Sequence, residues 1–154
     1  MPAKPIPDNY PILTPYLFVK DAAAAIEFYR LAFGARERMR LPCPDGKVGH
    51  AELEIGGALI MLADEYPEMA FRSPEAIGGS PVTLHMYVQD VDECCWRAVA
   101  AGATLIRPVQ DQFYGDRSGQ LRDPFGHLWS VASQVEQISL QELEKRAATM
   151  YGNE

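Results

Sequence analysis

Two histidines and a glutamate are the side chains of this sequence best suited to chemistry. His50 and Glu52 stand two residues apart in the segment 47–55, where alternating polarity predicts a strand with both on one face. His85 belongs to a second predicted strand, 83–88. Imidazole and carboxylate groups can hold a divalent metal ion, and imidazole alone can act as an acid or a base near neutral pH. Three interpretations stay open: a metal site of His50, Glu52 and His85, metal-free acid–base groups, or polar residues of a pocket wall or solvent-facing surface.

Aromatic side chains accompany these polar groups. The segments 14–19 and 83–88 alternate in polarity, which predicts two strands that each have one apolar face. The opposite faces carry Thr14, Tyr16 and Phe18, and Thr83, His85 and Tyr87. Aromatic walls with a few polar groups are typical of small-molecule pockets. We therefore predict that these two faces line a cavity.

The elements that position these residues occur twice in the chain. Residues 14–21 align with 83–90 at an offset of 83 − 14 = 69, and the same offset relates Gly57 to Gly126. Asp21 and Asp90 are expected to cap helices near 22–33 and 91–101. The remaining strands are expected near 36–41, 47–55, 58–63, 104–109, 120–122 and 127–133. The sequence thus predicts an α+β fold of two βαβββ modules, about 10–65 and 80–135, joined by a linker at 66–79.

A further helix is predicted in the segment 136–154, after the domain that occupies residues 1–135. Ser139 and Glu142 form a capping box before an amphipathic helix near 140–150. Its apolar stripe must pack against its own module or against a partner subunit.

Composition excludes several classes of protein. The chain has 154 residues, 47% hydrophobic, and a net charge of −7, which suits one compact soluble domain and no nucleic-acid partner. It has no apolar run long enough to span a membrane and no signal peptide. The three cysteines, Cys43, Cys94 and Cys95, form no CxxC motif. A reducing, cytoplasmic location is therefore expected.

Four smaller patterns have structural interpretations. Arg36, Arg38 and Arg40 alternate along a strand, which is typical of a solvated face. The segment 114–117 is expected to be a loop with an ion pair or interface contact, although its arginine is an alternative clamp for a ligand carboxylate. Trp129 is expected in the core, while the adjacent Cys94 and Cys95 are expected on different sides of their helix, one of them partly exposed.

Four motifs together resemble the vicinal oxygen chelate superfamily, which contains glyoxalase I, bleomycin and fosfomycin resistance proteins and extradiol dioxygenases. They are TPYLFVKD at 14–21, AAAAIEFYRLAFGA at 22–35, GHAELEIGG at 49–57 and DPFGHLWS at 123–130. The resemblance is narrower to the PhnB-like branch and runs from about residue 10 to 135. It implies two βαβββ modules in a curved mixed sheet around a central cavity, helices on the outer face, and usually a homodimer.

The resemblance also implies where the catalytic members hold a divalent metal. The first-strand ligand lies seven residues before the capping Asp, at Thr14 and Thr83 here, and the last-strand ligand lies four residues after the turn Gly, at Met61 and Ser130. These neutral side chains are poor ligands for such ions. We therefore predict no cofactor, with one divalent ion at His50, Glu52 and His85 as the alternative.

The resulting hypothesis is a small-molecule-binding protein of the glyoxalase/bleomycin-resistance type, metal-independent, with a small organic ligand. A metal-dependent glyoxalase-like lyase, isomerase or dioxygenase with a non-standard His/Glu site is the alternative, and a dimeric interaction scaffold is a third. The predicted ligand-binding residues are Thr14, Tyr16, Phe18, His50, Glu52, Met61, Thr83, His85, Tyr87 and Ser130.

Overall fold

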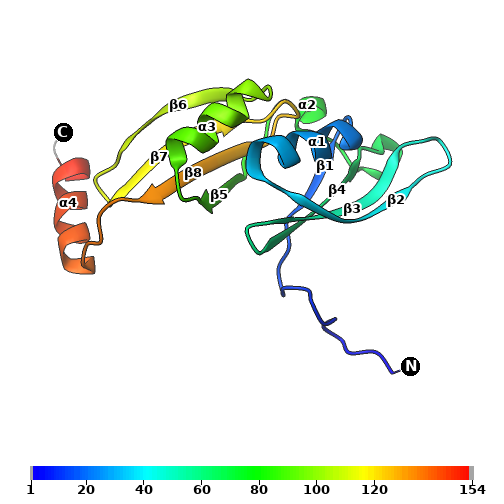
Figure 1. The fold of residues 1–154 in the computed structure, drawn as a ribbon, viewed down its shortest axis with the longest axis horizontal. Helices are drawn as coiled ribbons and strands as arrows, with labels where there is room; N and C mark the ends of the chain where they lie inside the picture. Colours follow the sequence, from blue (N-terminus) through cyan, green and yellow to red (C-terminus); the bar gives the residue numbers. More distant parts are fainter. Residues whose placement is uncertain (1, 153–154) are drawn as a thin grey trace. The chain divides into compact units, whose positions relative to one another are not determined.

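The computed structural model describes residues 2–152 and divides into two compact units, one ending at Gly79 and the other beginning at Ser80. Figure 1 shows one sheet with its own helix in each unit. Among the described residues, no helix is long and apolar enough to cross a membrane. The boundary between the units falls at the end of the linker that the sequence predicted.

Unit 1 contains the first βαβββ module. Its elements are β1 (Tyr16–Val19), α1 (Ala22–Phe33), β2 (Arg36–Pro42), β3 (Val48–Ile55) and β4 (Ala58–Asp64), followed by η1 (Pro67–Met69) and α2 (Pro74–Ile77). The strands form a sheet in the order β1-β4-β3-β2. β1 runs parallel to β4, and the other pairs are antiparallel.

Unit 2 repeats this arrangement. It contains β5 (Thr83–Tyr87), α3 (Val91–Ala100), β6 (Thr104–Asp111), β7 (Asp116–Arg122) and β8 (Leu128–Gln134), and it ends with α4 (Leu140–Gly152). The sheet order is β5-β8-β7-β6, again with one parallel pair, β5 and β8. The predicted α+β fold of two βαβββ modules is therefore confirmed, and each module forms its own four-stranded sheet.

The strand register confirms the internal repeat residue by residue. Tyr16 lies opposite Met61 between β1 and β4, and His85 lies opposite Ser130 between β5 and β8. Both pairs obey the predicted offset, because 16 + 69 = 85 and 61 + 69 = 130. The repeat thus extends to the pairing of strands that are distant in sequence.

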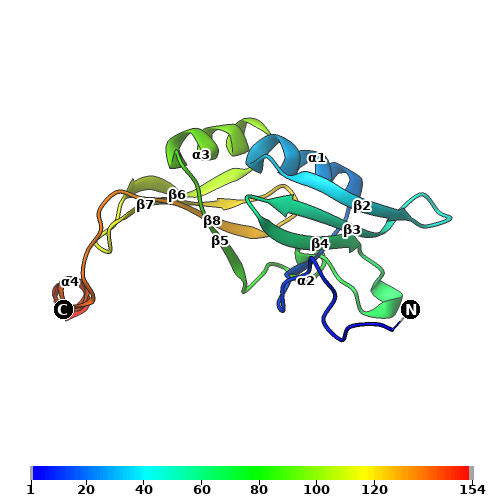
Figure 2. The same cartoon turned by 60° about the horizontal axis from the view of Figure 1, so that its bottom comes forward.

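Helix caps and apolar stripes explain why α1 and α3 form where they do. The Asp21 carboxylate accepts the Ala24 N–H at 3.1 Å, and Asp90 accepts the Glu93 N–H at 3.1 Å. α1 ends at Gly34, whose φ of 68° is the left-handed conformation that glycine tolerates best. Figure 2 shows each helix against one face of its own sheet, and the α1 residues that pack there are buried, among them Ala22, Ile26, Tyr29 and Phe33.

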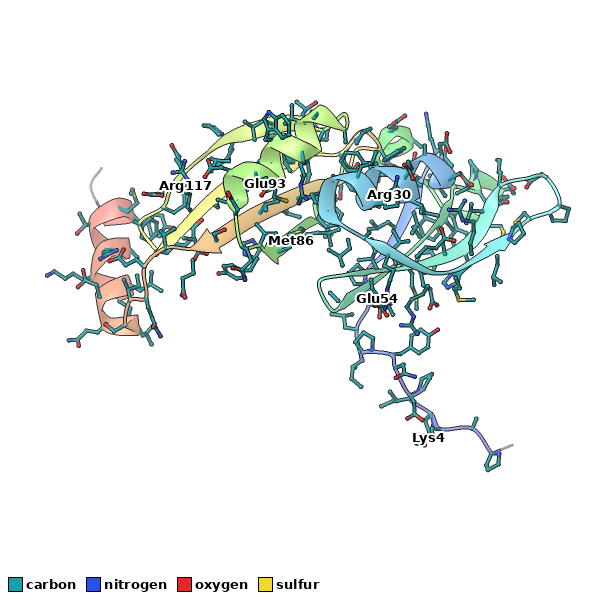
Figure 3. The ribbon with its side chains drawn as sticks, in the orientation of Figure 1. Lys4, Arg30, Glu54, Met86, Glu93 and Arg117 are labelled. Atoms are coloured by element: carbon teal, nitrogen blue, oxygen red, sulfur yellow. The ribbon has the colours of Figure 1, made fainter. Side chains whose placement is uncertain are left out.

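Two strand boundaries differ from the prediction. β1 begins at Tyr16, so Thr14 precedes the strand instead of opening it. β7 begins at Asp116, so half of the predicted 114–117 loop is strand. Its Arg117 pairs with Asp92 of α3 at 2.9 Å and with Asp111 at 3.1 Å, which confirms the predicted ion pair (Figure 3).

The prediction for the adjacent cysteines is wrong. Cys94 and Cys95 are both buried, because positions 91, 94, 95 and 98 form the i, i+3, i+4, i+7 stripe that α3 packs against its sheet. Trp129 is buried as predicted, and its indole N–H donates to the Asp123 carboxylate at 2.9 Å. At the C-terminal end, the Ser139 hydroxyl accepts the Glu142 N–H at 3.1 Å and so caps α4.

Candidate functional site

A chain of hydrogen bonds joins three of the predicted site residues across the sheet of unit 1. The Tyr16 hydroxyl lies 2.8 Å from His50 Nδ1, and His50 Nε2 lies 2.9 Å from Glu52 Oε2. Tyr16 pairs with Met61 and Met61 pairs with Glu52, so these three residues form one row across β1, β4 and β3. The alternation of side chains along strands therefore brings them to one face.

Glu52 is the buried end of this chain, only 3% exposed. Its other oxygen accepts the Tyr10 hydroxyl at 2.8 Å, and the Arg38 guanidinium lies 3.9 Å away. Burial raises the pKa of Glu52, but the hydrogen bonds from His50 and Tyr10 and the charges of His50 and Arg38 outweigh burial, and the net pKa is lowered. The carboxylate is therefore ionised at neutral pH.

The ionised carboxylate fixes the direction of the hydrogen bonds. Glu52 can only accept, so in the neutral form of His50 the proton lies on Nε2 and Nδ1 is left as an acceptor. Tyr16 then donates its hydroxyl hydrogen to Nδ1. Burial and the negative charge of Glu52 raise the pKa of Tyr16, so the phenol keeps its proton. The remaining lone pairs of the Tyr16 oxygen stay available to a ligand.

Tyr16 also borders a cavity of about 770 Å³ that lies entirely within unit 1. Its walls are rich in aromatic rings. The ring centroids of Tyr16 and Phe18 lie 5.1 Å apart, and Phe18 stacks on Phe71 with the ring centroids 4.7 Å apart and an angle of 7° between the ring planes. The complete lining is Tyr16, Phe18, Cys43, Pro44, Asp45, Gly49, Ala63, Asp64, Tyr66, Met69 and Phe71. This volume and lining suit an organic molecule of moderate size.

The Tyr66 hydroxyl is a buried polar atom in this wall that makes no hydrogen bond to any described residue. The nearby Cys43 thiol does not meet the geometry of a hydrogen bond, yet it is the main cause of the raised pKa of Tyr66, and burial is the second cause. Backbone hydrogen bonds with Phe71 in both directions hold Tyr66 in place. An unsatisfied buried group of this kind is uncommon in folded proteins.

Asp64 closes another side of the cavity and is 6% exposed. One carboxylate oxygen accepts the Ala22 N–H at 2.9 Å and the other accepts the Val48 N–H at 2.7 Å. No described basic side chain forms an ion pair with it. Its negative charge is therefore balanced only by two backbone dipoles.

The predicted residues of the second module form a separate group in unit 2. His85 Nδ1 lies 3.0 Å from the Ser130 hydroxyl, and the His85 ring packs edge-on against Tyr87 at 5.0 Å. The Tyr87 hydroxyl donates to the buried Asp116 carboxylate at 2.8 Å. Thr83 opens β5 and is exposed. The structure thus groups Tyr16, Phe18, His50, Glu52 and Met61 in one unit and Thr83, His85, Tyr87 and Ser130 in the other.

The four positions at which the resemblance implies metal ligands carry Thr14, Met61, Thr83 and Ser130. None offers an imidazole or a carboxylate, and the Ser130 hydroxyl already bonds to His85. Within the described residues, no group of three His, Cys, Asp or Glu side chains is placed to hold a metal ion. His50 and Glu52 form a hydrogen bond with each other. The side chains at the four implied positions therefore do not fit a divalent metal.

Several residues of the site were missed in the sequence. Tyr10 precedes the first strand and Arg38 was assigned to a solvated face, yet the Arg38 guanidinium lies 4.8 Å from the Tyr10 ring and both cover Glu52. Phe71, Tyr66 and Met69 belong to the predicted linker. A cluster of aromatic and apolar residues in a supposed linker is the signal that would have found these three, because such side chains need a packing surface.

The two βαβββ units, each with a parallel outer pair and a helix on one face, define the fold class of glyoxalase-like proteins. Residues 12–131 match the model of the Glyoxalase/Bleomycin resistance protein/Dioxygenase superfamily. The chain belongs to this superfamily.

Relatives and solved structures agree with this assignment. The chain is 47% identical over 137 residues to the "Uncharacterized protein Rv0887c" of Mycobacterium tuberculosis, covering 87% of this chain and 81% of that protein. TioX from Micromonospora sp. ML1 is 30% identical with a TM-score of 0.62, covering 84% of this chain and all of TioX. FosX from Listeria monocytogenes, solved with Mn(II) and sulfate, is 21% identical with a TM-score of 0.64, covering 89% and 97%, and at that identity it shows the fold alone.

Proposed function

We propose that this protein binds a small organic molecule in the aromatic cavity of unit 1. The observation that carries the proposal is the series of rings Tyr16, Phe18 and Phe71 along the wall of a cavity of about 770 Å³. Aromatic faces bury a large apolar area at low entropic cost, while Tyr16 supplies a polar group that can orient the ligand. An interaction scaffold would have no need of such a hollow.

We further propose that binding requires no metal and no other cofactor. Support comes from the neutral side chains at the four positions named above and from the mutual hydrogen bond of His50 and Glu52. A ligand held this way is sequestered by packing and hydrogen bonds rather than by coordination.

The proposal is tested with a library of planar heteroaromatic compounds, screened by thermal shift and confirmed by calorimetry. At least one compound should bind with a stoichiometry of one molecule per chain, and mass spectrometry should show that the bound compound is chemically unchanged. Phe71→Ala should weaken binding, whereas Trp96→Ala, which removes an exposed ring of α3, should not. A library without a single hit, or hits equally tight on Phe71→Ala, would contradict the proposal.

A second candidate is a metal-free acid–base enzyme, favoured by the chain Tyr16–His50–Glu52. A ligand proton would pass to the Tyr16 oxygen while the phenol proton moves to His50 Nδ1, and Glu52 would stabilise the imidazolium. The metal-dependent lyase, isomerase or dioxygenase would instead need His50 and Glu52 to give up their mutual hydrogen bond. For this reason it ranks below the metal-free candidate.

The cleavage of 5-nitrobenzisoxazole separates the enzyme from the binding protein. A base removes the proton on C3, the electron pair of that C–H bond completes a nitrile, and the N–O bond breaks to release a phenolate. If the protein is an enzyme of this kind, wild type should cleave the compound faster than buffer alone, and His50→Gln should abolish that excess rate. Equal cleavage rates with wild type and His50→Gln favour the interpretation as a binding protein.

We also infer a cytoplasmic homodimer. In the described residues Cys43, Cys94 and Cys95 form no disulfide, which suits a reducing compartment. α4 leaves Leu140 and Met150 exposed at 70% and 57%, as an unpartnered interface would. Light scattering after gel filtration should give a mass of 2 × 17.1 = 34.2 kDa. A mass of one chain would exclude the dimer.

A further inference from the structure

The lining of the cavity in unit 1 specifies the charge of its ligand. We propose that the ligand is an organic cation with a planar apolar body, such as an aromatic ammonium or iminium compound. This inference rests on the proposed function, since it concerns the same cavity.

The first argument is the number of ring faces. Tyr16, Phe18, Tyr66 and Phe71 all border the cavity. The negative face of an aromatic ring attracts a cation, most strongly where water is displaced. Lys47, which is not part of the lining, shows this attraction, because its Nζ lies 5.2 Å from the centroid of the Tyr66 ring. A bound cation would meet the same kind of surface on several sides.

The second argument is the charge of the lining. It contains two carboxylates, Asp45 and Asp64, and no lysine, arginine or histidine. Asp64 is almost fully buried, and among the described residues its hydrogen-bond partners are the backbone N–H groups of Ala22 and Val48. Asp45 is exposed at the rim and accepts the Lys47 N–H at 3.0 Å. An anionic ligand would face both charges across a partly dry space, whereas a cation would be stabilised by them.

The third argument is the polarity of Tyr16. In the neutral form of His50 the bond of Nε2 to Glu52 leaves Nδ1 as an acceptor, and the Tyr16 hydroxyl hydrogen is directed to it. The phenol oxygen therefore offers lone pairs, not a hydrogen, to the cavity. Its partial negative charge adds to that of the two carboxylates. Tyr16 and the two carboxylates therefore favour the same sign of charge.

Two dyes of matched shape test the proposal. Thioflavin T is a planar benzothiazolium cation, and 2-[4-(dimethylamino)phenyl]-6-methylbenzothiazole is its neutral counterpart without the ring N-methyl group. Fluorescence titration gives the affinity of the cation, and competition gives that of the neutral dye. Thioflavin T should bind about tenfold more tightly, because a desolvated cation–π contact contributes roughly 1–2 kcal/mol. Raising the NaCl concentration from about 50 to 500 mM should weaken the binding of thioflavin T and leave that of the neutral dye unchanged.

Charge removal inside and outside the cavity provides the matched controls. Asp45→Asn should weaken thioflavin T about threefold and leave the neutral dye unchanged, since a rim charge contributes less than about 1 kcal/mol. Asp8→Asn removes the same charge from the exposed N-terminal segment, where Asp8 pairs with Lys4, and should change neither affinity. Asp64→Asn is informative only after its thermal unfolding shows that unit 1 still folds.

The outcomes separate the two proposals. Equal affinities for both dyes, or no effect of Asp45→Asn and salt on thioflavin T binding, would contradict the proposal of a cationic ligand. The proposal that the protein binds a small organic molecule would not be affected. Binding of neither dye together with neutral hits from the compound library would also overturn the cation. A library without hits of any charge would overturn the proposed function itself.

Discussion

At the scale of single residues, Glu52 shows how a buried charge is tolerated beside the cavity. Its two oxygens accept hydrogen bonds from Tyr10 and His50, and Arg38 lies within 3.9 Å. A buried carboxylate without such partners would cost several kcal/mol. The same partners orient His50 and, through it, the phenol of Tyr16. We therefore propose that Glu52 acts by positioning His50 and Tyr16.

We predict that Glu52→Gln destabilises the protein at pH 7 by about 2 kcal/mol, because hydrogen bonds to a buried charge are replaced by weaker ones. The lowered pKa of Glu52 adds a pH dependence. The stabilisation is complete above the ordinary carboxyl pKa of 4.5 and is lost as the pH falls through the lower folded pKa.

Urea unfolding at pH 7 and at pH 3.5 measures this effect. The difference in the free energy of unfolding between wild type and Glu52→Gln should be smaller at the lower pH. Glu144→Gln, an exposed change on α4, is the control and should match wild type at both. A gap of constant size would show that the charge of Glu52 does not matter.

Tyr66 and Tyr10 make a second contrast between residues. Tyr66→Phe removes a buried hydroxyl that has no partner among the described residues, so we predict an unchanged or higher melting temperature. Tyr10→Phe removes a donor to Glu52 and should lower it. Calorimetry of the two variants checks the prediction. A drop for Tyr66→Phe as large as that for Tyr10→Phe would indicate that the Tyr66 hydroxyl has a bound partner in solution.

At the scale of elements, Asp64 ties together three parts of unit 1. It ends β4, accepts the first N–H of α1 from Ala22, and accepts the N–H of Val48 at the start of β3. The position related by the repeat, Ser133 (64 + 69 = 133), instead donates to the Val88 carbonyl at 2.7 Å. The duplicated modules therefore close the same corner of the sheet with different chemistry.

We predict that Asp64→Ala costs about 3 kcal/mol, because two buried N–H groups lose a charged acceptor. Ser133→Ala, which removes one neutral hydrogen bond, should cost about 1 kcal/mol. Hydrogen exchange of the backbone amides shows where in the chain each substitution has its effect. Asp64→Ala should accelerate exchange at Ala22 and Val48 and in unit 1, while unit 2 keeps its protection. Faster exchange spread evenly over both units would refute a local role.

At the scale of the whole molecule, the repeat supplies two sheets that have diverged on the same face. Tyr16 corresponds to His85, and Met61 corresponds to Ser130. In unit 1 Tyr16 borders an aromatic cavity, whereas in unit 2 His85 and Ser130 form a polar pair. At the positions where the resemblance implies metal ligands, the described residues of both units carry neither an imidazole nor a carboxylate.

We therefore predict that protein purified without tag or chelator contains far less than one transition-metal ion per chain, measured by elemental analysis. Dialysis against EDTA should leave the melting temperature and the binding of library hits unchanged. A content of about one Zn, Mn, Ni or Fe per chain would contradict metal-independent binding. It would direct attention to His50, Glu52 and His85 as ligands, with His85→Ala as the first variant.

The amino-acid sequence by itself determined the elements and their repetition. Alternation along 83–88, the caps at Asp21 and Asp90 and the offset of 69 are local signals, because each depends on the backbone geometry of a few neighbouring residues. Strand alternation also selected Tyr16, Phe18, His50 and Glu52 as candidate ligand-binding residues. The limits of strands were less certain, as Thr14 and Asp116 show.

Only the tertiary structure decided what completes the site of unit 1. Tyr10 reaches Glu52 across 42 residues of sequence, and Phe71 comes from a supposed linker to stack on Phe18. Such contacts join segments without any periodic relation, so no sequence spacing records them. They form because a buried carboxylate needs donors and an exposed ring needs apolar surface, and only the folded chain shows which residues can meet those needs.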